Sequence, residues 1–517
     1  MASNPAMPAT SSASARISAA RIGSARWLVF AVLALAALLI RLPGLGDAAH
    51  DFDEQLYHLA GTRMLEDAFP YVEVWDRKPF GLFAIYAFAA ALSGGSVMGY
   101  QLLAVAFAAI GACQVYVLAR RFADMFAGLA SAAFYLICFP LFSAPSGQSE
   151  VFYLPLLLGM LQLTIAASER TTISAAMKPL LLAMLLGGLA LQIKYTVLPQ
   201  CMLLGIAALW RLRQLGADPR SLAKHGATFA SIGLAPTALV AAGYAIAGHF
   251  DAFAYANFQS IFARGTLTDG ASTEFVRWIG YGSSWLIALA AIGGLLVLSG
   301  ARQVQSGYGL IAAFLAASLI GMAMIGNIYV HYFLPGAAAL VLLAAPAMSG
   351  WLAGRVLALI GLYLAIGFSH FDALAERGRA DRAGMAEATA LIAPHVGSRH
   401  NCLFVYDGPT ALYRATGSCL PSRLAYPDHL NNALEMNSVG IDTGAEMRRI
   451  FAQRPAVVTD SKLTAAAARN PVTGAIVRDE LARNYTQIGE VFFPPRMVEV
   501  HLRRDLLKTL PNKETAR

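Results

Sequence analysis

The sequence predicts an α-helical polytopic membrane protein with about eleven transmembrane helices and a small C-terminal α/β domain outside the membrane. Three observations predict this class: 57% of the residues are apolar and only 14% charged, the mean hydropathy is +0.55, and several long runs carry no charge. Soluble domains usually carry about 25% charged residues. Residues 27–40 and 98–118 contain no charged side chain. With their polar, neutral flanks, such runs reach the ~20 residues that a helix needs to cross a bilayer.

The chain of 517 residues divides into three expected regions. Residues 1–25 are rich in Ala and Ser and are expected to form a disordered cytoplasmic tail. Residues 26–370 form the transmembrane domain, with a first outer loop over 43–99, and residues 371–517 form the α/β domain. A cleaved signal peptide would open in the same way, but the many later spans favour a retained first helix. The expected spans are 27–42, 100–118, 127–142, 152–167, 179–193, 197–210, 229–247, 279–298, 308–325, 332–348 and 351–368.

Charge divides the loops between two sides of the membrane. Arg120, Arg170, Arg211 and Arg302 lie in loops on one side, which the positive-inside rule makes cytoplasmic together with the N-terminus. The net charge of +8 therefore reflects topology, and we expect no nucleic-acid partner. An odd number of spans leaves the C-terminal domain on the periplasmic face of a bacterial inner membrane. The first outer loop holds eight acidic residues, namely Asp47, Asp51, Asp53, Glu54, Glu66, Asp67, Glu73 and Asp76.

Two extramembrane segments carry their own structural signals. The apolar run 80–91 is only about three turns long, so we expect an interfacial helix rather than a span. In the C-terminal domain, β-rich runs predict strands over 402–406, 456–459, 490–493 and 498–502, and helical patterns predict helices over 409–416 and 444–453. The two halves of the chain show no internal repeat, which weighs against transporter folds built from repeated bundles.

The acidic motif His50-Asp51-Phe52-Asp53-Glu54 is the most informative stretch. Its three carboxylates within four residues raise one another's pKa and are costly to hold together. One interpretation makes Asp53 or Glu54 a general base beside a bound hydroxyl, with Asp51 as a competing candidate. The alternative is a solvated acidic loop or a calcium-like cluster that binds a divalent cation. If the following segment is helical, Asp53 and Tyr57 share one face, and Asp53 is expected to cap that helix.

Cationic residues on the outer face point to an anionic ligand. Lys78 lies where the chain re-enters the interface, which suits a lipid phosphate, although a lysine that merely snorkels beside a helix is the alternative. Lys194 lies between two apolar runs, and ionisable groups at that depth usually mark a functional site. Glu150 is expected to pair with Lys194 or to contact a sugar. Each residue taken alone has a structural explanation. Three further residues complete the expected pocket: Arg264, His331 and Tyr332.

A resemblance to a known family rests on the order of short motifs along the chain. These are Asp53-Glu54, Tyr57, Lys78-Pro79, Ser149-Glu150, Gly188-Leu189-Ala190 with Lys194, and Tyr332-Phe333-Leu334-Pro335. Their order resembles the GT-C superfamily of glycosyltransferases. The most similar groups are the dolichyl-phosphate-mannose protein mannosyltransferase relatives and the bacterial aminoarabinose and Rgt-type lipopolysaccharide transferases. The resemblance covers residues 25–350. Two positions depart from it: Phe80 stands where many relatives carry a second proline, and Leu56 where some carry an arginine.

The resemblance implies a reaction and a division of roles. A sugar would pass with inversion from a polyprenyl-phosphate donor to a hydroxyl of a glycan, lipid or protein acceptor. Asp53 would be the catalytic base. Lys78 and Lys194 would bind the donor phosphate, with Arg264 as a third candidate. The alternative function is a transporter or flippase of lipid-linked glycans, which would bind the same phosphates without a base. A non-catalytic assembly subunit is a third alternative.

Cys402 and Cys419 are the candidates for a disulfide. Each opens an expected extended run, and a helix is expected between them. If the two runs are adjacent parallel strands, both cysteines begin at one sheet edge, near the ~5.5 Å Cα separation that a disulfide needs. An oxidising outer compartment would preserve the bond. The alternative is two unpaired thiols that flank a helix.

Overall fold

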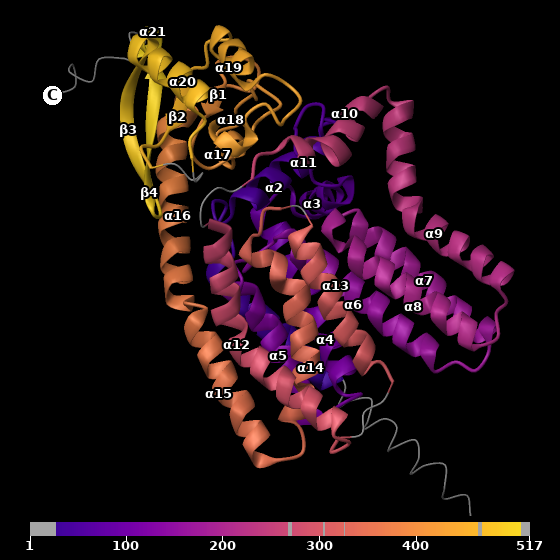
Figure 1. Cartoon of the computed structure of the whole chain (residues 1–517). Helices are drawn as coiled ribbons and strands as arrows, with labels where there is room; N and C mark the ends of the chain where they lie inside the picture. The colour runs from indigo at the N-terminus through magenta and orange to yellow at the C-terminus, as the bar shows by residue number, and fades with distance from the viewer. Residues whose placement is uncertain (1–26, 267–270, 303–305, 325, 464–467, 508–517) are drawn as a thin grey trace, which may run out of the picture.

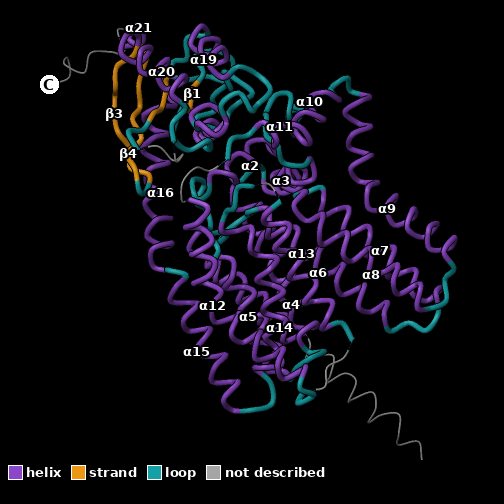
Figure 2. Tube along the Cα trace, viewed as in Figure 1, coloured by secondary structure: helices purple, strands orange, loops and turns teal. Residues whose placement is uncertain are grey.

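The computed structural model describes residues 27–266, 271–302, 306–324, 326–463 and 468–507. The expected cytoplasmic tail, residues 1–25, lies outside them. Within the described residues, nine helices are long and apolar enough to cross a membrane. The protein is therefore a multi-pass membrane protein whose helices form one elongated bundle, with the small sheet at one end (Figures 1 and 2).

All eleven expected spans coincide with helices. Two of them, α5 (Met125–Leu141) and α13 (Tyr308–Ala323), have 17 and 16 residues, and at ~1.5 Å per residue they fall slightly short of a 30 Å slab. The nine longer segments are Trp27–Gly44, α4 (Val97–Ala119), α6 (Ser149–Ser168), α7 (Ile173–Leu191), Tyr195–Gln214 with α8 (Leu198–Gln214), α9 (Pro219–Ile246), Ser272–Leu298 in α12 (Ala271–Leu298), Val330–Met348 with α14 (Leu334–Met348), and Leu352–His395, which joins α15 (Leu352–Phe368) to α16 (Phe371–Ile392).

The helix α14 forms the centre of the bundle. All of its residues are buried, and it packs against α12, α5 and α13. Its sequence is rich in alanine and contains no charge, and small residues allow helix backbones to approach closely in membranes. At Gly293 of α12, an added Cβ would lie only 2.4 Å from the carbonyl oxygen of Leu343. By contrast, α9 is mostly exposed and lies at the edge of the bundle (Figure 1).

Two helices of the first outer loop cover the end of the bundle near the sheet. They are α2 (Phe52–Met64) and α3 (Phe80–Ser93), the latter at the place expected for an interfacial helix. They pack closely at Gly61, where an added Cβ would lie 2.6 Å from the backbone nitrogen of Ala87. The loop between α6 and α7 and the C-terminal end of α8 lie at the other end of the bundle (Figure 1). These two segments are basic, and the Arg211 side chain donates a hydrogen bond to the Arg170 carbonyl.

The C-terminal domain contains a four-stranded sheet in the order β1-β2-β4-β3. The strands β1 (Leu403–Val405) and β2 (Val457–Asp460) are parallel, whereas β4 (Arg496–Arg503) runs antiparallel to both β2 and β3 (Tyr485–Phe493). All four expected strands are present, and α19 (Thr443–Ala452) matches the second expected helix. The first expected helix is reduced to the single turn α17 (Leu412–Ala415). Neither α16 nor α20 (Pro471–Asn484) was expected.

Cys402 and Cys419 form a disulfide, with their Cα atoms 4.9 Å apart. The expectation that both cysteines open adjacent strands was wrong, because only Cys402 precedes a strand. Cys419 lies in an irregular segment, and its N–H donates to the carbonyl of Gly397 over 2.9 Å. The neighbouring Ser418 hydroxyl accepts a 2.7 Å hydrogen bond from the Leu403 N–H at the start of β1. These two bonds, rather than strand pairing, bring the cysteines together.

Candidate functional site

The first turn of α2 arranges the three clustered carboxylates. Asp51 has an extended backbone, and its Oδ1 accepts hydrogen bonds from the backbone N–H groups of Asp53 (2.9 Å) and Glu54 (3.3 Å). This is the geometry of a helix N-cap. The expectation that Asp53 caps the helix was therefore wrong by two residues. Because Asp51 takes the cap, the Asp53 side chain is free to face other groups.

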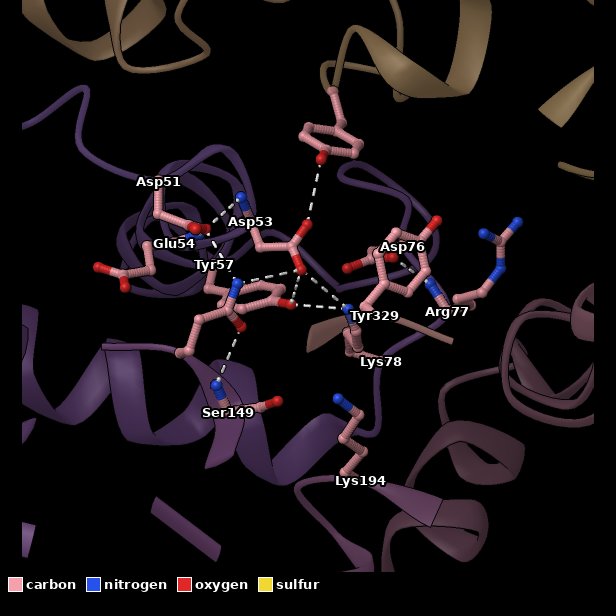
Figure 3. Close-up of polar contacts among 12 residues, drawn as sticks. Asp51, Asp53, Glu54, Tyr57, Asp76, Arg77, Lys78, Ser149, Lys194 and Tyr329 are labelled. Carbon is pink, nitrogen blue, oxygen red and sulfur yellow. Dashed lines mark hydrogen bonds and ion pairs between the residues drawn. The ribbon is translucent and has the colours of Figure 1, made fainter. Parts of the chain in front are cut away.

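The Asp53 carboxylate lies at the centre of a polar network (Figure 3). Its Oδ2 accepts hydrogen bonds from the Tyr57 hydroxyl at 3.1 Å, the Lys78 ammonium at 3.4 Å and the Gln148 amide at 3.5 Å. Its Oδ1 accepts one from the Tyr426 hydroxyl at 3.1 Å. Lys78 also donates to the Tyr57 oxygen over 2.7 Å. The expected i, i+4 pairing of Asp53 with Tyr57 is thus present on one face of α2.

Asp53 and Glu54 differ in protonation and in exposure. Burial raises the pKa of Asp53, but the Lys78 ammonium lowers it more, so the pKa lies well below its usual range. Burial and the neighbouring Asp51 raise the pKa of Glu54 to about 8, which leaves Glu54 mostly protonated at neutral pH. The Glu54 side chain is fully buried and points away from Lys78, whereas 28% of the Asp53 side chain is exposed (Figure 3). Of these two carboxylates, Asp53 is therefore the one that can accept a proton from a ligand.

Lys194 forms a buried ion pair just after the C-terminal end of α7. Its ammonium lies 2.5 Å from Oε1 of Glu150 in the first turn of α6, and the two side chains are 7% and 0% exposed. The same ammonium lies 3.8 Å from the centre of the Tyr332 ring. His331 packs edge-on against Tyr332, with ring centres 4.9 Å apart. The structure thus brings together these four residues, which the sequence had predicted to share a pocket.

Close packing between α3 and the turn after α7 brings the two lysines to one site. The N–H of Leu82 donates to the Gln192 carbonyl over 3.1 Å, and an added Cβ at Gly81 would lie 2.7 Å from that oxygen. Lys78 lies just before α3, on the N-terminal side of Leu82. Lys194 lies just after α7, on the C-terminal side of Gln192. In Figure 3 the Lys194 ammonium points toward Lys78 and Asp53. Burial lowers the pKa of Lys78, but Asp53 and then Asp76 raise it more, so Lys78 remains charged.

Arg264 forms an ion pair with a carboxylate of the C-terminal domain. Its Nε lies 2.6 Å from Oε1 of Glu435, and its Nη2 donates to the Tyr329 hydroxyl over 3.0 Å. Arg77 donates two hydrogen bonds to the same carboxylate, at 2.7 and 2.6 Å. Glu435 is 2% exposed. Burial raises its pKa, but the Arg77 hydrogen bonds and both arginine charges lower it to about 2.

Three contributors to this site were missed from the sequence. Gln148 directly precedes the predicted Ser149-Glu150 motif, so the sequence could have indicated that Gln148 lies in the site. Tyr426 and Glu435 lie more than 350 residues from the groups that they contact in the first outer loop, and their local sequence carries no such signal. Within the described part of the chain, no group of three or more His, Cys, Asp or Glu side chains is arranged to hold a metal ion.

Fold and site together define a multi-pass helical membrane protein that holds an ionised carboxylate beside two lysine ammonium groups, at the end of the bundle nearest the sheet. The fold is similar to that of ArnT from Cupriavidus metallidurans bound to undecaprenyl phosphate, with a TM-score of 0.62 and 14% identity, over 92% of this chain and 98% of that one. It is also similar to the apo oligosaccharyltransferase of Archaeoglobus fulgidus, with a TM-score of 0.51 and 12% identity, over 84% and 69% of the two chains. The sequence matches no protein-family model and no curated protein. The chain therefore shares its overall fold with these two solved structures.

Proposed function

We propose that this protein is a glycosyltransferase that moves a sugar from a polyprenyl-phosphate donor to an acceptor hydroxyl at the outer face of the inner membrane. The observation that carries the proposal is the ionised, partly exposed Asp53 carboxylate held beside Lys78 and near Lys194. A carboxylate in this state suits a general base, and paired cations suit a phosphate. The similarity in fold to ArnT, a protein whose structure contains undecaprenyl phosphate, supports the lipid-linked donor.

In the proposed reaction, the carboxylate acts on the acceptor and the lysines act on the donor phosphate. Asp53 takes the proton of the acceptor hydroxyl, whose oxygen attacks the anomeric carbon from the face opposite the phosphate. The bond between that carbon and the phosphate oxygen breaks, and the polyprenyl phosphate leaves with the electron pair. Such a single displacement inverts the anomeric configuration, by the logic that governs inverting sugar hydrolysis. The acceptor is a hydroxyl of lipopolysaccharide, another glycan or a protein.

The site balances charge throughout this reaction. With a donor bound, two lysines oppose Asp53, Glu150 and the singly charged phosphodiester, which leaves one net negative charge. After transfer, Asp53 is neutral and the released phosphate carries two charges, so the net charge is unchanged. The cations therefore face a phosphate whose charge grows as the bond breaks, which is where preorganised electrostatic stabilisation is most effective. Tyr57 and Gln148 orient Asp53, and Glu150 with Tyr332 holds Lys194.

Glu54, Asp51, His331 and Arg264 take supporting roles in this proposal. Asp51 caps α2 and sets the direction of Asp53. Glu54 of α2 is fully buried, and His331 packs against Tyr332. Arg264 forms an ion pair with Glu435. Arg77 binds the same carboxylate, so two arginines share one negative charge. The positive charge that remains is what Arg264 can offer to the donor phosphate.

A donor screen tests the proposal. Purified protein is incubated with a panel of polyprenyl-phosphate sugars and a membrane extract, and the products are analysed by mass spectrometry and by anomeric NMR. We expect transfer of one sugar class with inverted configuration. If no donor yields transfer, while proteoliposomes of the protein move an intact lipid-linked glycan across the bilayer, the transporter interpretation replaces this one.

A further inference from the structure

A cavity lies beside the first turn of α2, where α16 and the turn between β3 and β4 meet the first outer loop. Its volume is about 280 Å³, which is near the lower end of the range for small-ligand pockets. In Figure 1, α16 lies to the left of α2 and α7 lies to its right. We name it the α16 cavity, and its wall includes Ala49, Phe52, Arg377, Asp381, Phe493 and Arg496.

Two charged side chains of α16 in this wall have unused hydrogen-bonding capacity. Asp381 is 2% exposed, and its Oδ2 accepts a hydrogen bond from Nε of Arg377 over 3.4 Å. Its other oxygen, Oδ1, accepts no hydrogen bond from any residue that the structure describes. The Arg377 side chain is 41% exposed, and its remaining N–H groups donate to none of the described residues. The pair therefore presents an open acceptor beside several open donors.

The charges in the wall of the α16 cavity are balanced. Arg377 is paired with Asp381, and Arg496 is paired with the fully buried Asp407. An anionic ligand would be repelled by the open oxygen of Asp381, and a cationic ligand would be repelled by the two arginines. A neutral ligand whose groups both donate and accept hydrogen bonds avoids both costs.

The remainder of the wall is mainly apolar. It contains Phe52, Phe493 and Pro494-Pro495, and the Arg496 guanidinium lies 5.1 Å from the centre of the Phe52 ring. A sugar ring has C–H groups that pack against such a surface and hydroxyls that can each donate and accept. A carboxylate beside a guanidinium is complementary to two neighbouring hydroxyls, because the first only accepts and the second only donates. The wall thus favours a neutral sugar unit.

The α16 cavity adjoins the carboxylate that we assign as the base. Phe52 directly precedes Asp53 in the chain, so their Cα atoms are about 3.8 Å apart. In Figure 3, Asp51 and Lys78 lie on opposite sides of the Asp53 carboxylate. An acceptor hydroxyl attacks from the face opposite the phosphate, so the acceptor enters from the side away from the lysines. The α16 cavity is on that side.

We propose that the α16 cavity binds a neutral sugar unit of the acceptor and directs a hydroxyl of the acceptor to Asp53. This inference rests on the glycosyltransferase function proposed above, and it narrows the acceptor to one that already carries sugar. Asp381 accepts a hydrogen bond from one hydroxyl of the unit, Arg377 donates to the next, and Phe52 packs against the ring. No bond forms or breaks in the cavity, so its contribution is to the binding and orientation of the acceptor.

Binding of simple glycosides tests the cavity without a donor. The purified full-length protein, in a detergent without a sugar headgroup, is mixed with the methyl glycosides of glucose, galactose, mannose and N-acetylglucosamine, and with methyl glucuronoside as an anionic probe. Saturation-transfer NMR detects binding. We expect a neutral glycoside to bind, and Arg377→Ala to weaken that binding about tenfold, which is the scale of one hydrogen bond to a charged group. Binding of the anionic probe alone, or of no glycoside, would overturn the proposal.

Transfer kinetics connect the cavity to the acceptor. With the active donor from the donor screen, the membrane-extract concentration at half-maximal rate should rise about tenfold in Arg377→Ala and in Asp381→Asn, and the donor KM should not change. Arg377 and Asp381 are four residues apart on α16. The matched control is Arg483→Ala, which removes an arginine from an exposed pair with the same spacing and should change neither quantity. Thermal unfolding of each variant shows that folded proteins are compared.

The outcomes separate this inference from the proposed function. If the wild type transfers sugar and both α16 variants keep its dependence on extract, the acceptor does not use the α16 cavity. The inference is then overturned while the proposed function stands. If the wild type binds a neutral glycoside but transfers sugar from no donor, the proposed function fails, and the acceptor role of the cavity fails with it.

Discussion

Glu435 joins three separate segments of the chain, so the substitution Glu435→Gln tests the contacts that hold these segments together. Its carboxylate binds Arg77 of the first outer loop through two hydrogen bonds and Arg264 through a third contact, all between 2.6 and 2.7 Å. Glutamine keeps the shape of the side chain but removes the charge and one acceptor oxygen. Two largely buried guanidinium groups, 12% and 11% exposed, then lose their counter-ion.

The magnitude follows from burial and from the pKa of Glu435. The carboxyl is 2% exposed, and removing one partner of such a buried pair costs about 3–5 kcal/mol. The folded pKa of about 2 lies below the ordinary value of 4.5. At about 1.4 kcal/mol for each pH unit, this difference corresponds to ~3 kcal/mol of stability. Because the folded pKa is lowered, the contribution is complete above about pH 4.5 and is lost as the pH falls toward 2.

Thermal unfolding in detergent, measured at pH 7 and at successively lower pH, tests this reasoning. Glu435→Gln should unfold at a clearly lower temperature than wild type at pH 7, and the difference should shrink below about pH 4.5 as the wild-type carboxyl becomes protonated. The matched control is Asp479→Asn, which removes a carboxylate from an exposed surface ion pair with Arg483 and should change stability by less than about 1 kcal/mol. Equal effects of the two substitutions, or a difference independent of pH, would refute the reasoning.

Three further predictions concern packing, topology and the disulfide. Gly61→Ala should destabilise the protein by about 1–3 kcal/mol, because the added Cβ meets the α3 backbone at 2.6 Å; an unchanged unfolding temperature would contradict this close packing. Reporter fusions at Arg170 and Lys462 should report the cytoplasm and the periplasm respectively, and a cytoplasmic signal at Lys462 would reverse the assigned topology. Non-reducing peptide mapping should recover Cys402 linked to Cys419, and replacing both with serine should lower stability by up to ~3 kcal/mol for a loop of this size; two free thiols would disprove the bond.

Hydropathy predicted the helical bundle well because the membrane makes burial of charge so costly that spans stand out in the sequence. The position of the two lysines near the acidic motif was also predictable, since Lys194 lies between apolar runs and Lys78 precedes a short helix; their role in binding phosphate stays a proposal. The cap of α2 was not predictable. Asp51 and Asp53 are both good N-cap residues before the same segment, and only the extended backbone at Asp51 decides between them.

Long-range contacts account for most of what the sequence did not reveal. Tyr426 and Glu435 act on the first outer loop through tertiary contacts between segments remote in the chain, and no local period or motif encodes such contacts. Arg264 was predicted as a third candidate for phosphate binding because it is a cation in an expected outer loop. The structure supplies the missing partner, Glu435, from a domain whose role the sequence left open. The same is true of the disulfide, where Ser418 rather than a second strand positions Cys419.

The most direct test of the central claim separates donor binding from turnover in three variants of the purified protein. Asp53→Asn should lower sugar transfer by roughly 10²–10⁴-fold while binding of the polyprenyl-phosphate sugar survives. Lys78→Ala should weaken both, because the lysine contacts the phosphate before and during bond breakage. Asp67→Asn, which removes an exposed carboxylate from the same loop at a left-handed backbone position that asparagine tolerates, should change neither. Transfer at the wild-type rate by Asp53→Asn would contradict the account.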